Sequence, residues 1–268
     1  MRAGAAVLVM LLTVGCTGRV NGMPTEELIF ENPLYVEAAK AARQGDVATL
    51  EKLIEQGLDV NYEGRETKAP WGKDTVTLLL WATLSENAKG AEALLKAGAD
   101  PNKATRRGMT ALIMATGMES DELFDLLLVR HNASPNRIYD GSMKTAPMVA
   151  LKERALGEKR FERAEMLIKH GADVNLDIDR GETAAIAFSR LQDWRAVSWL
   201  LEHGADHERR DSVRGTIMCY LRNSYRANTL APSEAFTYRD KVGDWLLALG
   251  VTRSRLDPAL HPSPKCDD

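Results

Sequence analysis

The apolar residues of this chain fall into short blocks at helical spacing, and polar stretches separate the blocks. Residues 91–97 (AEALLKA) and 164–170 (AEMLIKH) place apolar side chains three and four positions apart, which predicts amphipathic helices. A glycine-containing polar stretch follows each block, and a second apolar block then begins with threonine. The pattern therefore predicts pairs of short helices joined by polar hairpin loops.

The helix pairs recur with a fixed period. From Gly98 to Thr110 is 12 residues, and from Thr77 to Gly98 is 21, which gives a period of 33. Such a fixed period is the sequence signature of a repeat architecture. The repeated phrase appears, in chain order, as EQGLDVN at 55–61, KAGADPN at 96–102, RHNASPN at 130–136, KHGADVN at 169–175 and EHGADHE at 202–208.

These motifs resemble the ankyrin repeat, whose unit is a turn followed by two helices over about 33 residues. The resemblance implies an all-α solenoid of about five ankyrin repeats plus a divergent C-terminal cap, over residues 33–250. Residues 17–32 are then expected to be a linker or tether, and residues 251–268 a C-terminal tail. The Thr-Pro-Leu-His segment of the family nowhere retains its histidine, so the hydrogen bonds of that residue are not expected here.

The histidines of the repeats have a structural explanation. His170 and His203 directly precede Gly171 and Gly204, which are expected to close their helices in the left-handed conformation that glycine adopts without steric cost. His131 holds the same position before Asn132. We therefore expect no metal site, and we reject a zinc pair of His203 and His207 because a turn separates them.

The N-terminus has the pattern of a secretory signal. Residues 1–16 contain a basic start, an apolar run too short to span a bilayer, and Gly15 before Cys16. This end resembles the lipobox of bacterial lipoproteins, although Thr13 departs from the usual leucine. The resemblance implies lipidation of Cys16 and a periplasmic location, with Thr17 favouring the outer membrane. The alternative is a fortuitous cysteine in an ordinary signal peptide.

Composition narrows the classes of function. The formal net charge of −3 argues against nonspecific nucleic-acid binding, which requires a basic face. We find no nucleophile motif, phosphate-binding loop or metal-ligand spacing, so we expect neither catalysis nor a cofactor. Cys219 and Cys266 form either a disulfide, which an oxidising compartment permits, or two free thiols.

An insertion interrupts the first hairpin and contains a tryptophan in a polar context. From Gly57 to Thr77 is 20 residues, eight more than the regular 12, and Trp71 lies within this insertion. Because Lys68, Lys73 and Asp74 resist burial, we expect Trp71 to be displayed at the rim of a binding surface. The alternative is that Trp71 folds back onto the first helix pair.

Other candidate contact residues follow from the position of the repeats. Apolar residues occupy a slot after three first helices, where the resemblance implies contact with a partner, and burial by longer helices is the alternative. These residues are Leu84, Met118 and Leu191; Lys152 occupies the slot in the fourth repeat. The hairpin tips add charged and polar residues that could orient a protein partner, namely Arg106, Arg107, Tyr139, Asp140, Lys144, Asp177, Asp179 and Arg180.

Repeats combined with a lipoprotein signal resemble the immunity lipoproteins that protect Gram-negative bacteria from phospholipase effectors of the type VI secretion system. The resemblance implies a protein that binds a secreted lipase and blocks its active site, and that meets the membrane through its N-terminal lipid alone. Two alternatives remain open at this stage. One is a scaffold or accessory lipoprotein for an envelope or stress-defence enzyme, and the other is a ligand-binding protein with a lid at 62–76.

Overall fold

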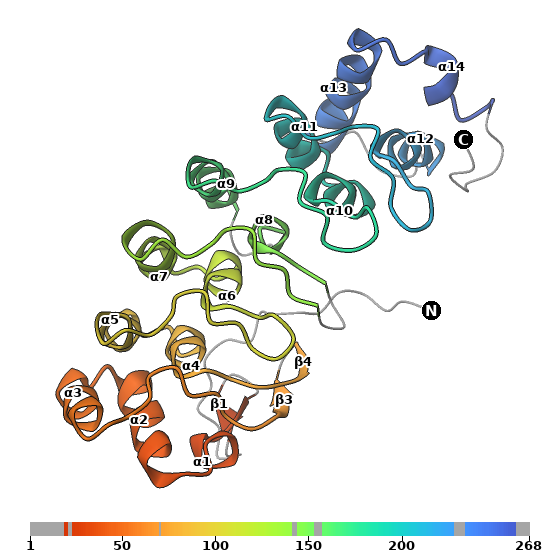
Figure 1. The fold of residues 1–268 in the computed structure, drawn as a ribbon. Coiled ribbons are helices and arrows are strands. Elements are labelled where there is room, and N and C mark those ends of the chain that lie inside the picture. Colours follow the sequence, from red (N-terminus) through yellow and green to blue (C-terminus); the bar gives the residue numbers. More distant parts are fainter. Residues whose placement is uncertain are drawn as a thin grey trace. The chain divides into compact units, whose positions relative to one another are not determined.

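The structure is a computed structural model that describes residues 19–20, 23–69, 71–140, 144–152, 157–227 and 234–260. The chain divides into two compact units, Met1–Ala172 and Asp173–Asp268, and each is described by itself. The described residues are mostly helical, and the helices follow one another in pairs (Figure 1). The predicted helix pairs are therefore present in both units.

Unit 1 contains two small antiparallel sheets and the helices of the first repeats. The strands are β1 (Arg19–Val20), β2 (Met23–Pro24), β3 (Thr67–Ala69) and β4 (Gly72–Asp74). The first helices of the pairs are α2 (Pro33–Gln44), α4 (Leu78–Leu84), α6 (Ala111–Gly117) and α8 (Pro147–Ala150). Their partners are α3 (Val47–Glu55), α5 (Ala88–Lys96), α7 (Asp121–Asp125) with the π-helix η1 (Leu126–Arg130), and α9 (Lys159–Lys169).

The two helices of each pair lie in two rows within unit 1 (Figure 1). Helices α2, α4, α6 and α8 form one row, α3, α5, α7 and α9 form the other, and the hairpin loops extend from the first row. Thr77 and Thr110, which open two of the second apolar blocks, act as N-caps, whereas α8 has Ala146 in that position and no side-chain cap. The Oγ1 atom of Thr77 accepts from the backbone N–H of Leu80 at 3.1 Å, and Thr110 caps α6 in the same way. Such a cap satisfies a donor that the helix leaves unpaired.

The asparagine of the repeated phrase joins each repeat to the next. The Nδ2 atom of Asn61 donates to the carbonyl of Gly98, and its Oδ1 atom accepts from the N–H of Asp100. Asn175 makes the same pair of bonds to Gly204 and Asp206 in unit 2. The sequence analysis missed this role, although the recurrence of asparagine in the phrase was a signal for it.

Unit 2 continues the pattern with longer final helices. It contains α10 (Ala184–Arg190), α11 (Trp194–Glu202), α12 (Ile217–Ala227), α13 (Glu234–Ala248) and α14 (Arg253–Leu256). Its core includes Ile186, Phe188, Val197 and Leu221, which are almost fully buried. The guanidinium of Arg222 is also buried, and its Nη1 atom donates to the carbonyl of Arg255 at 3.2 Å.

Two segments that the sequence predicted as peripheral contain packed structure. Within the expected tether at 17–32, helix α1 (Glu26–Ile29) buries Ile29, and the adjacent Phe30 is also fully buried. Within the expected tail at 251–268, α14 buries Leu256. Helix α1 packs against α2 and α14 packs against α12, so each segment adds to the packing of a terminal repeat.

Among the described residues, no helix combines the length and apolar character needed to cross a bilayer. Cys219 is buried in α12 and is disulfide-bonded. Its expected partner, Cys266, and the expected lipidation site, Cys16, lie outside the described residues.

Candidate functional site

The insertion in the first hairpin forms a short β-hairpin of its own. Strands β3 and β4 pair antiparallel, with Lys68 opposite Lys73 and Ala69 opposite Gly72. Trp71 lies at the turn and is only 4% exposed, so the expected display of its side chain is wrong. The alternative, that Trp71 folds back, agrees with this burial. The indole is buried although the loop around it is polar, because Asp74 accepts a hydrogen bond from its Nε1 atom and Tyr139 of the third hairpin bonds to its carbonyl.

Asp74 is the residue around which the inserted hairpin is organised. Its carboxylate is fully buried, and Oδ2 accepts from Trp71 Nε1 at 3.2 Å and from Thr105 Oγ1 at 2.7 Å. Oδ1 accepts from the N–H groups of Thr75 at 2.9 Å and Arg107 at 3.3 Å. Four donors therefore offset the cost of removing this charge from water. The expectation that Asp74 resists burial is therefore wrong, because donors from two different hairpins satisfy its carboxylate.

Tyr139 extends this arrangement to the third hairpin. Its ring is fully buried, and its hydroxyl donates to the carbonyl of Trp71 at 3.1 Å. Burial, and secondarily the charge of Asp74, raises the pKa of this hydroxyl, which therefore stays protonated as a donor. The expectation that Tyr139 is exposed at a tip is thus wrong. The insertion holds the first three hairpins of unit 1 together.

Charged side chains lie on the exposed side of the same hairpins. Lys73 and Arg106 have side chains that are 74% and 71% exposed, and both pair with Glu66, at 2.6 Å and 3.1 Å. The hydrogen bond from Lys73 holds the pKa of Glu66 below its usual value. The half-buried Arg107 donates to the carbonyl of Lys73. Lys73, Arg106 and Arg107 therefore lie together, as a contact surface requires.

The third hairpin adds an ion pair beside these residues. Asp140 and Lys144 pair at 2.8 Å, and the hydrogen bond from Lys144 lowers the pKa of Asp140. The N–H of Asp140 donates to the carbonyl of Arg107 at 2.6 Å, which joins the tips of the second and third hairpins. Residues 141–143 of this tip lie outside the described residues.

The three apolar residues expected to form a groove do not share one environment. Leu84 is 6% exposed because every residue of α4 is buried, so its expected exposure is wrong. Met118 is half-buried, and its carbonyl accepts from the buried Arg163, which also reaches the carbonyl of Thr116 at 3.0 Å. Leu191, in unit 2, is 53% exposed. The structure does not bring these residues together in one unit.

The remaining predicted contact residues are divided between the units. Lys152, in unit 1, is half-buried. In the unit 2 hairpin, Asp177 pairs with Arg209 at 2.8 Å and also accepts from the N–H of Gly181. Arg180 is exposed at that turn and Asp179 is half-buried. Asp177 therefore stabilises its own turn through Gly181 and also contacts the following hairpin through Arg209.

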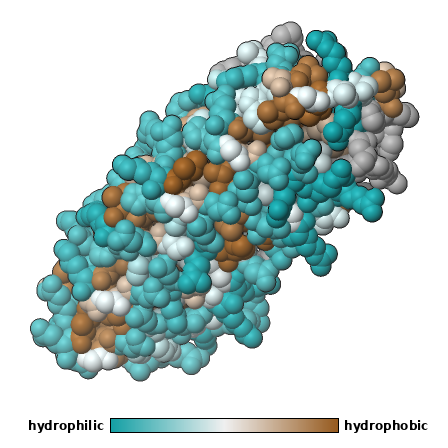
Figure 2. Space-filling model, turned by 45° about the horizontal axis from the view of Figure 1, so that its top comes forward, coloured by the Kyte–Doolittle hydropathy of each residue, from teal (hydrophilic) through white to brown (hydrophobic). Residues whose placement is uncertain are grey.

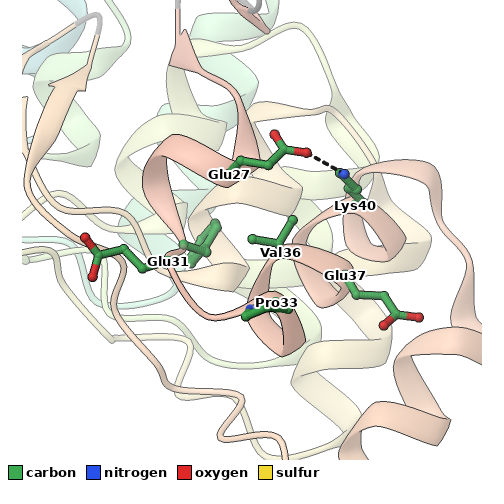
Figure 3. A pocket seen from close by; sticks show the side chains of 7 residues that line it. Glu27, Glu31, Pro33, Val36, Glu37 and Lys40 are labelled. Atoms are coloured by element: carbon green, nitrogen blue, oxygen red, sulfur yellow. Dashed lines mark ion pairs between the residues drawn. The ribbon is translucent and has the colours of Figure 1, made fainter.

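A shallow groove lies between α1 and α2 at the start of unit 1 (Figure 3). Its volume is about 410 Å³, and Phe30, Pro33 and Val36 supply its apolar lining. The ion pair of Glu27 and Lys40, at 2.5 Å, crosses one side of it. The hydrogen bond from Lys40 lowers the pKa of Glu27 to about 2. The segment 62–76 contacts this groove, because Arg65 pairs with Glu31 of the lining at 3.0 Å and the ring of Tyr62 lies beside Phe30. Trp71 and Asp74 of the same segment are buried.

The surface in view is mostly hydrophilic, with apolar residues in separate groups (Figure 2). Among the described residues, no group of three or more His, Cys, Asp or Glu side chains is placed to hold a metal ion. The hairpins of unit 1 carry exposed charged side chains, such as Lys73 and Arg106, on a backbone that hydrogen bonds hold in place. Such side chains can bind the surface of another protein.

Comparisons with known proteins agree with the repeat pattern. Residues 38–139 match a family model described as ankyrin repeats in three copies. Inversin of Gallus gallus is 39% identical over 97 residues, which cover 36% of this chain and 8% of inversin. A mitochondrial disaggregase of Bos taurus is 29% identical over 182 residues, which cover 65% of this chain and 25% of the disaggregase. The matched residues therefore span at most a quarter of the length of these relatives.

Among solved structures, the human ASB11 ankyrin repeat domain is similar with a TM-score of 0.54 at 24% identity. The similarity covers 84% of this chain and 91% of that domain. At this level of identity it concerns the fold alone. Ankyrin repeats are generally protein-interaction modules without catalytic activity, so the family match over residues 38–139 implies a protein-binding role. The fold of this chain is an ankyrin-repeat helical solenoid, and residues 38–139 also match the ankyrin family in sequence.

Proposed function

We propose that this chain is a membrane-anchored periplasmic immunity protein that binds a phospholipase toxin effector and inhibits it. The observation that carries the binding role is the inserted hairpin of unit 1. Asp74 and Tyr139 fix its backbone, while Lys73 projects from it into water, beside Arg106 of the second hairpin. A surface that is already ordered loses little conformational entropy on binding.

The finer parts of the proposal rest on the sequence of residues 1–16 and on the resemblance that this segment and the repeats share with immunity lipoproteins. A lipid on Cys16 would concentrate the inhibitor at the membrane, where a phospholipase must act. The proposed interface is of the usual size for a stable complex, about 1,600 Å² in total.

The proposal is tested by capture followed by an enzyme assay. The tagged full chain is used to capture proteins from a periplasmic extract of the bacterium that encodes it, and each captured protein is assayed with a fluorogenic phospholipid. We expect a captured phospholipase whose activity falls at least tenfold when the chain is added in equal amount. If the captured proteins lack phospholipase activity, or if the chain leaves it unchanged, the immunity function is wrong. An unchanged or increased activity of a captured envelope enzyme would favour the scaffold alternative.

A matched variant tests the anchor separately. Cys16→Ser removes the proposed lipidation site and leaves the repeats unaltered. We expect this variant to move from the membrane fraction to the soluble periplasmic fraction while it inhibits the captured phospholipase equally well in detergent. Equal membrane association of the two proteins would contradict lipidation at Cys16.

A further inference from the structure

The inserted hairpin of unit 1 places two lysines directly opposite each other. Lys68 and Lys73 face each other in the register of β3 and β4, and both side chains are exposed. Like charges in this arrangement destabilise a strand pair. Glu66 contacts Lys73 and Arg106 but makes no ion pair with Lys68 within the described part of the chain. Within the described residues the charge of Lys73 is therefore matched by Glu66, whereas that of Lys68 is matched by no ion pair.

We define the tip surface as Lys68, Lys73, Arg106, Arg107 and Glu66. Four cations and one carboxylate give these five residues a formal charge of +3, in a chain whose formal net charge is −3. The neighbouring Asp140 and Lys144 cancel each other, and Glu63, which accepts from Thr75, lowers the local surplus to +2. Asp74 lies beneath the tip surface, but that carboxylate is fully buried and accepts four hydrogen bonds from within the protein. The positive surplus therefore faces outward.

The backbone under the tip surface is fixed before any partner arrives. The N–H of Arg106 donates to Thr75 Oγ1 at 3.0 Å, and the N–H of Arg107 donates to Asp74 Oδ1. These bonds join the second hairpin to the insertion. Folding has therefore already ordered the backbone that carries Arg106 and Arg107. Binding of a ligand then loses less conformational entropy.

We propose that the tip surface is the docking site for an acidic segment of the partner protein, whose Asp and Glu carboxylates pair with Lys68, Lys73 and Arg106. This inference deepens the proposed function, because it rests on the chain being a protein-binding module and names the chemistry of the partner's surface. A protein is favoured over an anionic membrane because Trp71, the apolar residue of the hairpin that would enter a bilayer, is buried. Complementary charge of this kind chiefly raises the association rate and the specificity.

The test uses the purified full chain and a fluorescein-labelled decaglutamate peptide, with binding measured by fluorescence anisotropy at low and at high salt. The test variant is Lys68→Glu, Lys73→Glu and Arg106→Glu combined. The control variant has the same change in charge on the outer helices α3 and α5, at the exposed positions Lys52→Glu, Lys89→Glu and Lys96→Glu. Thermal unfolding of all three proteins establishes that each is folded.

We expect the tip variant to weaken peptide binding at least tenfold and the control variant to weaken it less than twofold. Equal weakening by both variants, or no binding by the unaltered chain, would overturn the proposal. Phosphatidylglycerol vesicles are measured in parallel, and tip-dependent binding to vesicles without binding to the peptide would assign the surface to a membrane instead. The peptide assay requires no phospholipase, so it can succeed where the capture experiment fails, and the two failures are distinguishable.

Discussion

Unit 1 and unit 2 each contain a hairpin that is organised around a buried aspartate. The two aspartates differ in how far away along the chain their hydrogen-bond donors lie. Asp211 accepts from the N–H groups of Val213 and Gly215, and from Tyr220 Oη at 2.6 Å. Among the described residues, its donors lie within nine positions of it along the chain. Asp74 instead accepts from Thr105 and Arg107, which lie 31 and 33 residues away in the next hairpin.

A buried aspartate can thus stabilise a single turn or connect two hairpins, depending on where its hydrogen-bond donors lie. A buried carboxylate is tolerated when donors satisfy its oxygens. Where the donors are local, as at Asp211, the carboxylate shapes one turn. Where they come from another repeat, as at Asp74, the carboxylate makes the position of one hairpin depend on its neighbour. We therefore expect damage at Asp74 to spread between repeats and damage at Asp211 to stay within one turn.

The largest effect is expected from Trp71→Ala. Truncating a buried tryptophan removes apolar contacts and leaves a cavity, so the free energy of unfolding should fall by about 4 kcal/mol. Urea denaturation followed by circular dichroism measures the change. Trp199→Ala in α11 is the control, because that indole is partly exposed, and a smaller loss is expected. A Trp71 variant of unchanged stability would show that the indole does not hold the hairpins.

A smaller effect, but the clearest separation of the two hairpins, is expected from Asp74→Asn and Asp211→Asn. The amide keeps the shape but places an N–H group among donors, so each change should cost about 2 kcal/mol. Hydrogen exchange should then accelerate in two separate hairpins for Asp74→Asn, at 67–75 and at 105–109. For Asp211→Asn it should accelerate at 211–215 alone. Exchange confined to β3 and β4 in the Asp74 variant would refute the long-range role of this carboxylate.

The smallest effect is expected from Tyr139→Phe. This change removes one neutral hydrogen bond to the carbonyl of Trp71 and should lower the free energy of unfolding by about 1 kcal/mol. Tyr220→Phe removes a bond to the ionised Asp211, and because bonds to charged groups are stronger, it should cost about 2 kcal/mol. Burial and Asp211 hold the pKa of Tyr220 well above its usual value, so neither difference should depend on pH between 6 and 9. A larger loss at Tyr139 than at Tyr220 would reverse this ranking.

The helix pairs could be predicted from the sequence because their signals are local. A threonine cap, an apolar spacing and a glycine at the helix end each depend on a few neighbouring residues. The asparagine of the repeated phrase was visible as a recurrence, but its role needed the next repeat to be in place, since Asn61 bonds to Gly98 and Asp100.

The site was harder to predict for the same physical reason. Lys73, Arg106 and Arg107 were identified from their place in the hairpins, and the structure brings them together. Trp71 and Tyr139 were expected in water because their neighbours are polar. Their burial depends on Asp74, Thr105 and each other, across up to 68 residues of chain. No local pattern contains that information.

The bonds that hold the inserted hairpin also bear on its resistance to proteases. Lys68, Lys73, Arg106 and Arg107 are all cleavage positions for trypsin-like enzymes, which usually cut at exposed loop tips. A protease must draw several residues of extended backbone into its cleft, so cleavage follows the fraction of time that the segment is open. Because Thr75, Asp74 and Tyr139 oppose that opening, trypsin should cut slowly at these four positions. The rate of cleavage at Lys68 and Lys73 is then a measure of how often the inserted hairpin opens.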